Sequence, residues 1–136
     1  MRNNKEHISQ VQVFLWRDLN VHLYRCLKYM YAIPNMSNSH VNFRVKLKAE
    51  GLKKGMLDFC LPLPKLYCGE DPNHGLYIEM KVPPIQSSKI STDQKDVLKY
   101  LIDVGYEAQV AWSADEAIAI IKQYINPEET RWVDFQ

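Results

Sequence analysis

The sequence predicts an α/β fold in which helices flank a mixed central β-sheet. Helical and extended patterns alternate along the chain, two extended segments follow one another without a helix between them, and a later extended segment is preceded by a helix. Strands joined directly tend to pair antiparallel, whereas a strand–helix–strand step gives parallel neighbours. A sheet that contains both kinds of pair is mixed, and the interleaved helices cover its faces.

Length and composition predict one folded domain. The chain has 136 residues, of which 46% are hydrophobic and 24% charged, and these values exclude an intrinsically disordered chain. We place the domain at residues 1–126 and an acidic tail at residues 127–136. The net charge is only +1, but residues 1–92 carry 13 basic and 7 acidic residues and residues 93–136 carry 4 and 9. The near-neutral total therefore does not exclude a nucleic-acid partner.

The cysteine pattern and the lack of long apolar segments predict a soluble, cytoplasmic protein. The three cysteines, Cys26, Cys60 and Cys68, are an odd number without repeated spacing, which argues against a disulfide framework and for a reducing compartment. The N-terminus lacks the apolar stretch of a signal peptide. No apolar run approaches the roughly 20 residues that span a bilayer, so we expect no membrane partner.

The N-terminal part of the chain predicts two helices and a short strand. Residues 29–33 form an aromatic and β-branched run stopped by Pro34, which indicates a strand and a turn. Residues 39–50 repeat apolar side chains every four residues before Gly51, as in a helix with a glycine stop. Residues 5–19 predict a helix, because four apolar residues recur on one stripe: Ile8, Val11, Leu15 and Leu19.

The second part of the chain contains three predicted strands and two predicted helices. The first two strands end at prolines, which cannot continue a ladder of hydrogen bonds. Both helices begin at a serine followed three residues later by Gln or Glu, the pattern of a capping box. The strands are predicted over residues 55–61, 76–82 and 106–112, and the helices over residues 91–105 and 113–125.

Charged residues on the two central strands indicate a catalytic site. Glu79 and Lys81 share one face of their strand, on the order of 7 Å apart along it, and Asp58 lies on the preceding strand. Charges on a half-buried sheet need partners, and Mg²⁺ is a partner that takes carboxylate oxygens together with water and substrate phosphate. The alternative is an ion pair of Lys81 with Asp58 or Glu79 on an exposed face, without a catalytic role.

Motifs along nearly the whole chain resemble those of the virus-type replication-repair nuclease domain, VRR-NUC, of the PD-(D/E)xK nuclease superfamily. The family pattern runs K-x-E-G-x-x-x-G-x-P-D, then I-E-x-K, then S-x-x-Q, and closes with G-Y and a D-E-A-I-like helix. In this chain it corresponds, in the same order, to residues 48–58, 78–81, 91–94, 105–106 and 115–118. One departure is Leu57, which stands where the family usually has proline.

The resemblance implies a restriction-endonuclease-like PD-(D/E)xK core and an endodeoxyribonuclease that depends on Mg²⁺ or Mn²⁺. It implies that Asp58 and Glu79 bind the metal, with the backbone carbonyl of Met80 as a further ligand, and that Lys81 is the catalytic lysine. It also implies that Glu6, on the first helix, is an additional acidic residue that reaches the metal, and that Gln94, at the start of a later helix, supports the site.

The resemblance further implies a homodimer that cuts branched DNA, including four-way (Holliday) junctions. Two alternatives remain: a nuclease of linear, nicked or flapped DNA without junction preference, and a non-catalytic DNA-binding module. Five basic residues lie within eleven positions just before Asp58 and predict either a DNA-phosphate contact or a solvated helix face: Arg44, Lys46, Lys48, Lys53 and Lys54.

Several of these residues have simpler interpretations. Gln94 can cap its own helix, and Glu6 can favour a helix N-terminus electrostatically. Trp16 and Trp112 are expected in the core. A zinc site is disfavoured, because the spacing of the residues that could form it matches no standard finger: Cys60, Cys68 and His74.

Overall fold

The computed structural model of the chain describes residues 4–35, 40–66, 73–83, 89–126 and 131–132. Cys68 and most of the C-terminal tail lie outside these residues, as does the turn that follows Asn35. Among the described helices, none is long and apolar enough to cross a membrane.

Four strands form the central sheet, in the order β1-β2-β4-β5. β2 pairs antiparallel with both β1 and β4, and β4 pairs parallel with β5. The predicted mixed sheet is therefore confirmed, with the direct connection antiparallel and the connection through a helix parallel. The strands are β1 (Tyr31–Ala32), β2 (Phe59–Leu61), β4 (Leu76–Met80) and β5 (Glu107–Ala111).

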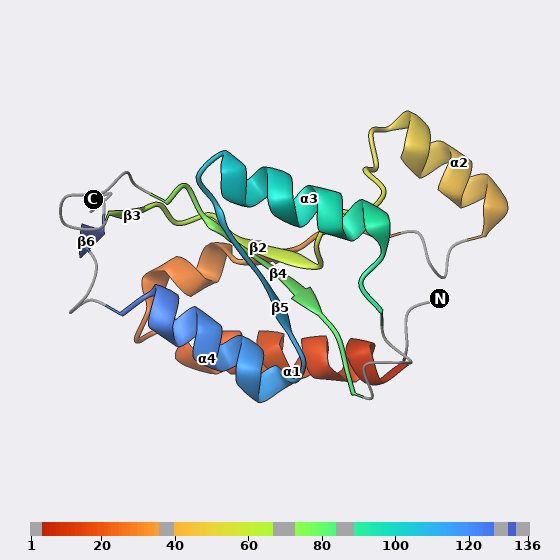
Figure 1. Ribbon diagram of the computed structural model, residues 1–136. Helices are drawn as coiled ribbons and strands as arrows, with labels where there is room; N and C mark the ends of the chain where they lie inside the picture. The colour runs from red at the N-terminus through yellow and green to blue at the C-terminus, as the bar shows by residue number, and fades with distance from the viewer. Residues whose placement is uncertain (1–3, 36–39, 67–72, 84–88, 127–130, 133–136) are drawn as a thin grey trace.

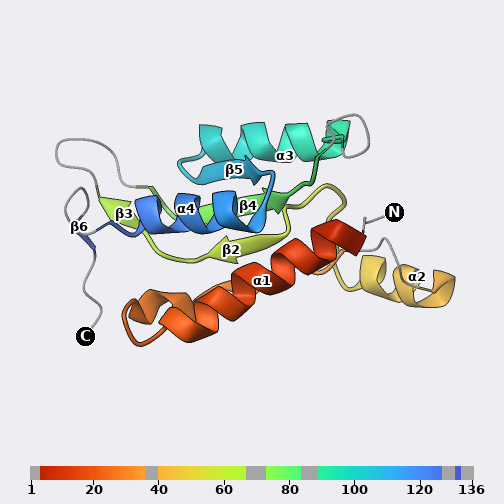
Figure 2. The ribbon, with the colours of Figure 1, turned by 90° about the horizontal axis from the view of Figure 1, so that it is seen from below.

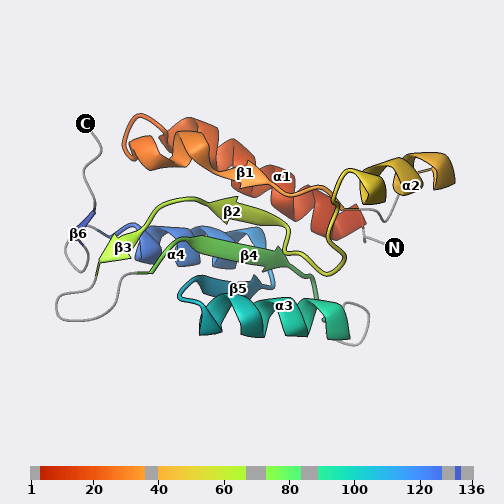
Figure 3. The same ribbon diagram turned by 90° about the horizontal axis from the view of Figure 1, so that it is seen from above.

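Helices cover both faces of this sheet. In Figures 1 and 2, α1 and α4 lie together on one face and α3 lies on the other, while α2 stands apart from these layers (Figure 3). The helices are α1 (Asn4–Asn20), α2 (Val41–Ala49), α3 (Thr92–Asp103) and α4 (Ala114–Tyr124), with a short 3-10 helix, η1 (Arg25–Tyr29), before β1.

The two C-terminal helices begin where the serine patterns predict. The Ser91 hydroxyl accepts a hydrogen bond from the Gln94 N–H, and the Gln94 side-chain oxygen accepts one from the Ser91 N–H, which completes a capping box. The Ser113 hydroxyl accepts the N–H of Glu116 at the start of α4. Each bond satisfies a donor that a helix N-terminus would otherwise leave without a partner.

Two apolar clusters, one on each face, anchor the sheet. The larger one joins the sheet to α1 and α4 and includes Phe59, Ile78 and Met80. The smaller one lies under α3 and consists of Leu57, Leu101 and Ala108, with partly buried side chains around them. Residues that alternate along β4 therefore serve opposite faces of the sheet, as the pleat requires.

The orientation of α1 differs from what its apolar stripe suggests. The four stripe residues are exposed, Leu19 by 74%, whereas Glu6 and Val13 are buried against the protein. Arg17, one turn after Val13, donates to the Met30 carbonyl at 2.8 Å. The side of α1 that faces the sheet thus carries Val13, with Phe14 and Trp16 packed against the same core, together with the polar Glu6 and Arg17.

Three further elements differ from the sequence-based expectations. The strand predicted over residues 29–33 is shortened to the two residues of β1, because Tyr29 still belongs to η1 and residues 30 and 33 are in no regular element. The strand predicted from residue 55 begins at Phe59, because a turn precedes it. A second sheet pairs two strands that the sequence did not indicate, β3 (Lys65–Leu66) and β6 (Arg131–Trp132).

The turn before Asp58 depends on a glycine that packs against the start of α3. Gly55 has a φ of +81°, and a Cβ built there would lie 2.6 Å from the Asp93 Cβ and 2.7 Å from its carbonyl carbon. Gly51 also has a positive φ, +103°, but a Cβ there would meet no atom within 4 Å. A side chain at Gly51 would therefore strain only the backbone, whereas a side chain at Gly55 would strain the backbone and also collide with Asp93.

We expect Gly55→Ala to destabilise the protein more than Gly51→Ala. Both substitutions strain the backbone, by about 1 kcal/mol each, but only Gly55→Ala pushes a methyl group into backbone atoms, which adds at least about 1–2 kcal/mol. Denaturant unfolding of the two variants and the wild type measures the difference. Equal losses in the two variants would contradict the packing role of Gly55.

Candidate active site

The proposed catalytic residues lie where the ends of four elements meet. β4 ends and β2 begins at this edge of the sheet, and α1 and α3 start beside it (Figures 1 and 3). The carboxyl ends of parallel strands are a common location for ligand sites in open α/β sheets. The direct connection and the crossover therefore bring residues that are distant in the sequence to one edge.

Asp58 lies immediately before β2 and is held against β4. Its carboxylate oxygen Oδ2 accepts the Met80 N–H at 2.7 Å, and the group is buried. Its backbone is held on both sides: the N–H donates to the Ile78 carbonyl at 3.0 Å, and the carbonyl accepts the Ile33 N–H at 2.8 Å. The main chain therefore sets the position of this carboxylate.

Glu79 and Lys81 form a buried ion pair at the end of β4. The Lys81 Nζ lies 3.2 Å from the Glu79 Oε1, and the two side chains are only 10% and 4% exposed. Lys81 lies one residue past the strand, where its N–H donates to the Ala111 carbonyl at 2.8 Å. An ion pair therefore forms, but not on an exposed face, so the simple surface interpretation does not describe it.

Gln94 both caps α3 and contacts the site. Its Oε1 accepts the Ser91 N–H, and its Nε2 donates to the Glu79 Oε1 at 2.5 Å. The two interpretations of this residue are thus compatible, because the two ends of one amide serve them separately. The cap fixes the side chain, and the fixed side chain then positions the Glu79 carboxylate.

The second oxygen of Glu79 is buried without a partner. Among the buried side-chain nitrogen and oxygen atoms of the described residues, Oε2 of Glu79 has no hydrogen-bond partner. A buried carboxylate oxygen left in this way is costly, since it has lost water and gained nothing. A ligand bound beside Oε2 would explain why this atom is buried without a protein partner.

The surroundings of Glu79 disfavour the ionised form of its carboxyl group. Burial and, next, the negative charge of Asp58 raise the pKa of the Glu79 carboxyl from 4.5 to about 8, although Lys81 opposes the shift. The charge of Glu6 adds to the increase in this pKa. A cation beside Oε2 would reverse this balance, because it favours the ionised form.

Glu6 reaches the surroundings of the site from the first turn of α1, where its side chain is buried. Within the described part of the chain, however, no three His, Cys, Asp or Glu side chains converge as a ready metal-binding group. The site therefore offers the carboxylates of Asp58 and Glu79 as its main oxygen donors. This set fits Mg²⁺, which commonly takes one or two carboxylates and keeps several waters.

The basic residues lie beside the site rather than in it. Arg44, Lys46 and Lys48 are exposed on α2, away from the sheet, and Lys53 and Lys54 follow in the turns before Asp58. Lys54 pairs with Asp93 at the start of α3, with an Nζ–Oδ2 distance of 3.1 Å. These five residues form a positively charged arm, which consists of α2 and the turns between α2 and Asp58.

The alternative sites receive little support. Cys60 is a buried free thiol in β2, and burial raises its pKa. Cys68, the second cysteine of the zinc hypothesis, lies outside the described residues.

A comparison with known proteins supports one fold family. No family model matches the chain, and no curated protein matches it. A solved structure described as "VRR_NUC domain protein" superimposes with a TM-score of 0.70 and 26% sequence identity, over 92% of this chain and 91% of that one. The chain has the fold of a VRR-NUC domain. This is a nuclease fold, and the expected fold class is confirmed.

Within this VRR-NUC fold, Leu57 replaces the usual proline by a different kind of anchor. Its side chain is 1% exposed and packs with Leu101 under α3. A proline would restrict the backbone before Asp58 directly, whereas Leu57 restrains it through apolar packing. The departure from the family motif therefore leaves Asp58 on a supported backbone.

One residue at this edge of the sheet differs from its sequence-based expectation. Trp112 was expected in the core, but among the described residues it belongs to neither apolar cluster, whereas Trp16 does pack against the larger one. Trp112 instead lines a groove beside the end of β4. The available signal was its position directly after β5, at the same strand end as the charged residues.

We expect Glu79→Gln to gain stability relative to the wild type as the pH rises. The pKa of Glu79 is about 8 in the folded protein, above the ordinary value of 4.5. The protonated carboxyl group therefore favours folding below pH 4.5, and this contribution to stability is lost as the pH rises from 4.5 through 8. The variant lacks this loss, which amounts to on the order of a few kcal/mol.

Urea unfolding at pH 5 and pH 8 in the presence of a chelator measures this difference. Glu50→Gln, at the exposed end of α2, is the matched control and keeps the wild-type dependence on pH. Parallel stability curves for Glu79→Gln and the wild type would show that Glu79 is not held in an unfavourable ionised state.

Proposed function

We propose that this protein is an endodeoxyribonuclease that hydrolyses phosphodiester bonds with the help of Mg²⁺ or Mn²⁺. The observation that carries the proposal is the buried Glu79 carboxylate, which has one oxygen held by Lys81 and Gln94 and the other without a partner. A purely structural ion pair with Lys81 would not explain why the second oxygen, Oε2, is buried without a hydrogen-bond partner. A cation that bridges protein and substrate phosphate accounts for it.

Asp58 and Glu79 would hold this cation, together with the Met80 carbonyl and, through its charge, Glu6. When bound, the cation supplies a Lewis acid that polarises a phosphoryl oxygen and lowers the pKa of water. The Lys81 ammonium orients the attacking water and offsets the negative charge that develops on the phosphate. Gln94 acts as a positioning residue, because it reaches the reaction only through the Glu79 carboxylate.

The substrate proposed is branched DNA, including four-way junctions, cut by a homodimer. The apolar stripe on α1 supports a second copy as partner, since Val11, Leu15 and Leu19 are exposed in a line along the helix. A two-fold dimer would carry two sites for paired cuts. We place this nuclease in the cytoplasm on the basis of its cysteine pattern, which includes the free thiols of Cys26 and Cys60.

A non-catalytic DNA-binding module is the competing proposal. It keeps the positively charged arm on α2 but gives Asp58, Glu79 and Lys81 only structural roles. The two proposals differ in what happens to DNA when a divalent metal is added, so cleavage rather than binding separates them.

We expect Asp58→Asn and Lys81→Ala each to reduce metal-dependent cleavage by on the order of 100-fold or more, while DNA affinity changes little. Asp58→Asn removes a charge that the cation needs, and Lys81→Ala removes the ammonium. A cleavage panel with four-way junction, flap, linear duplex and single strand, in Mg²⁺, Mn²⁺ and chelator, measures the effect and the substrate preference.

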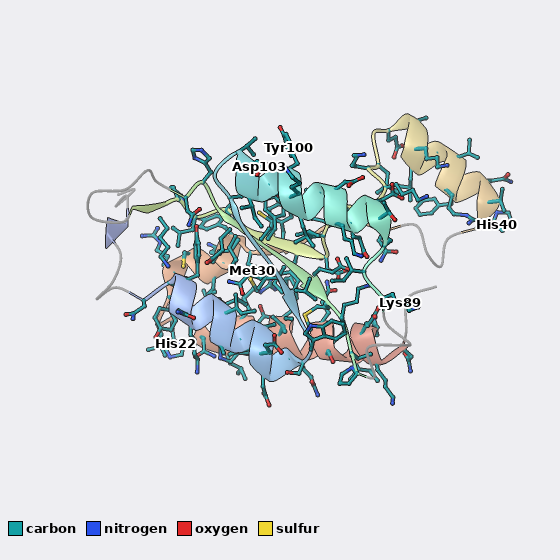
Figure 4. The ribbon with its side chains drawn as sticks, viewed as in Figure 1. His22, Met30, His40, Lys89, Tyr100 and Asp103 are labelled. Atoms are coloured by element: carbon teal, nitrogen blue, oxygen red, sulfur yellow. The ribbon has the colours of Figure 1, made fainter. Side chains whose placement is uncertain are left out.

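Lys99→Ala serves as the control for this panel. Lys99 is exposed on α3 and pairs with Asp103, which lies on the outer surface of that helix in Figure 4. Cleavage that survives both site substitutions would remove the catalytic assignment. A wild type that cleaves none of the substrates with either metal would favour the binding module.

We expect Lys46→Ala and Lys48→Ala to weaken DNA binding equally for all sequences. Each removed phosphate contact reduces the slope of log affinity against log salt concentration by about 1. Binding titrations at several salt concentrations measure the slope, again with Lys99→Ala as control. An unchanged slope in both variants would indicate that α2 carries only a solvated face.

A further inference from the structure

A groove of about 440 Å³ lies next to the catalytic residues on the side of α1. It is lined by Ile8 and Ser9 of α1, by Val82 and Pro83 after β4, and by Trp112 after β5. The volume falls in the range of pockets that hold a small organic group.

The groove is tied to the catalytic site by the main chain. Val82 directly follows Lys81, and Trp112 directly follows Ala111, whose carbonyl accepts the Lys81 N–H at 2.8 Å. Lys5, which also lines the groove, precedes Glu6 in the first turn of α1. Three chain segments therefore link the groove to residues that face the proposed scissile phosphate.

The lining combines a large aromatic ring with flat or branched apolar side chains and one ammonium group. An aromatic side chain beside aliphatic groups is a usual surface for stacking a nucleobase. Because every base has a flat face, such a surface accepts any of the bases. The Lys5 ammonium adds a charge suited to a phosphate. In a continuous duplex the faces of the bases are already stacked, so only an unpaired base can use this surface.

We propose that the groove binds the base of an unpaired nucleotide next to the scissile phosphodiester, with Trp112 as the stacking platform and Lys5 at the adjoining phosphate. The inference deepens the proposed function and rests on it for the position of the scissile bond. Trp112 would then help to select the substrate, because DNA with an unpaired base beside the cut would bind more tightly than fully paired DNA.

The binding step can be tested without cleavage. The probe is a flapped DNA with 2-aminopurine as the unpaired base, mixed with the wild-type protein in the presence of a chelator. Stacking on an indole quenches the emission of this base, so we expect at least a twofold decrease with the wild type. Trp112→Leu abolishes the decrease, Trp112→Phe restores part of it, and Tyr100→Leu, at an exposed aromatic on α3, leaves it unchanged.

The kinetic test uses Mg²⁺ and compares substrates with and without an unpaired nucleotide. For the flapped DNA we expect Trp112→Leu to raise KM about 5- to 100-fold, the range for loss of one stacked base, with kcat within about twofold. For a nicked, fully paired duplex, the same substitution leaves both constants unchanged. The split between KM and kcat separates base binding from a general loss of structure.

The outcomes distinguish this inference from the proposed function. If Trp112→Leu quenches 2-aminopurine as the wild type does, the groove does not bind the base, even where cleavage is intact. If the wild type quenches the 2-aminopurine emission but cleaves no DNA, the nuclease proposal is wrong and base binding in the groove is supported. If Trp112→Leu instead changes the sedimentation of the free protein and not the quenching, the groove is a contact between copies of the chain, and the inference is wrong.

Discussion

The buried carboxylate of Glu79 is the group on which the arrangement of the site depends. Its Oε1 is held by Lys81 and Gln94, while its Oε2 lies buried without a partner. Burial and the charge of Asp58 raise its pKa to about 8. The protein therefore holds this carboxyl group in surroundings that disfavour its ionised form, and a nearby cation is what would favour it.

The rest of the fold keeps this carboxylate buried and oriented. The capping box of α3 fixes Gln94, and the packing of Gly55 on Asp93 brings the turn before Asp58 against the same helix. On the other face, α1 packs Val13 into the core and buries Glu6 in its first turn. This helix orientation leaves the apolar stripe of Ile8, Val11, Leu15 and Leu19 exposed on the surface.

Much of the fold could be predicted from local patterns. Serine caps, proline stops and apolar periodicity located the helices, and the order of elements predicted the mixed sheet. The orientation of α1 could not be predicted in this way, because the helix carries two sets of apolar residues, the exposed stripe and the set of Val13, Phe14 and Trp16 that packs on the core. Which set is buried depends on the fit to the sheet, and the hydrogen bond from Arg17 to the Met30 carbonyl forms only after η1 has folded beside α1.

The sequence by itself determined which residue types are available and the order in which they occur: two carboxylates, a lysine and a capping glutamine, set on strands and a helix start by short-range chemistry. Only the tertiary structure decided that Glu79 is buried with one oxygen unpartnered, that Gln94 serves both its helix and the site, and that Trp112 lies outside the core. Burial and convergence arise between segments far apart in the chain, and local periodicity carries no information about them.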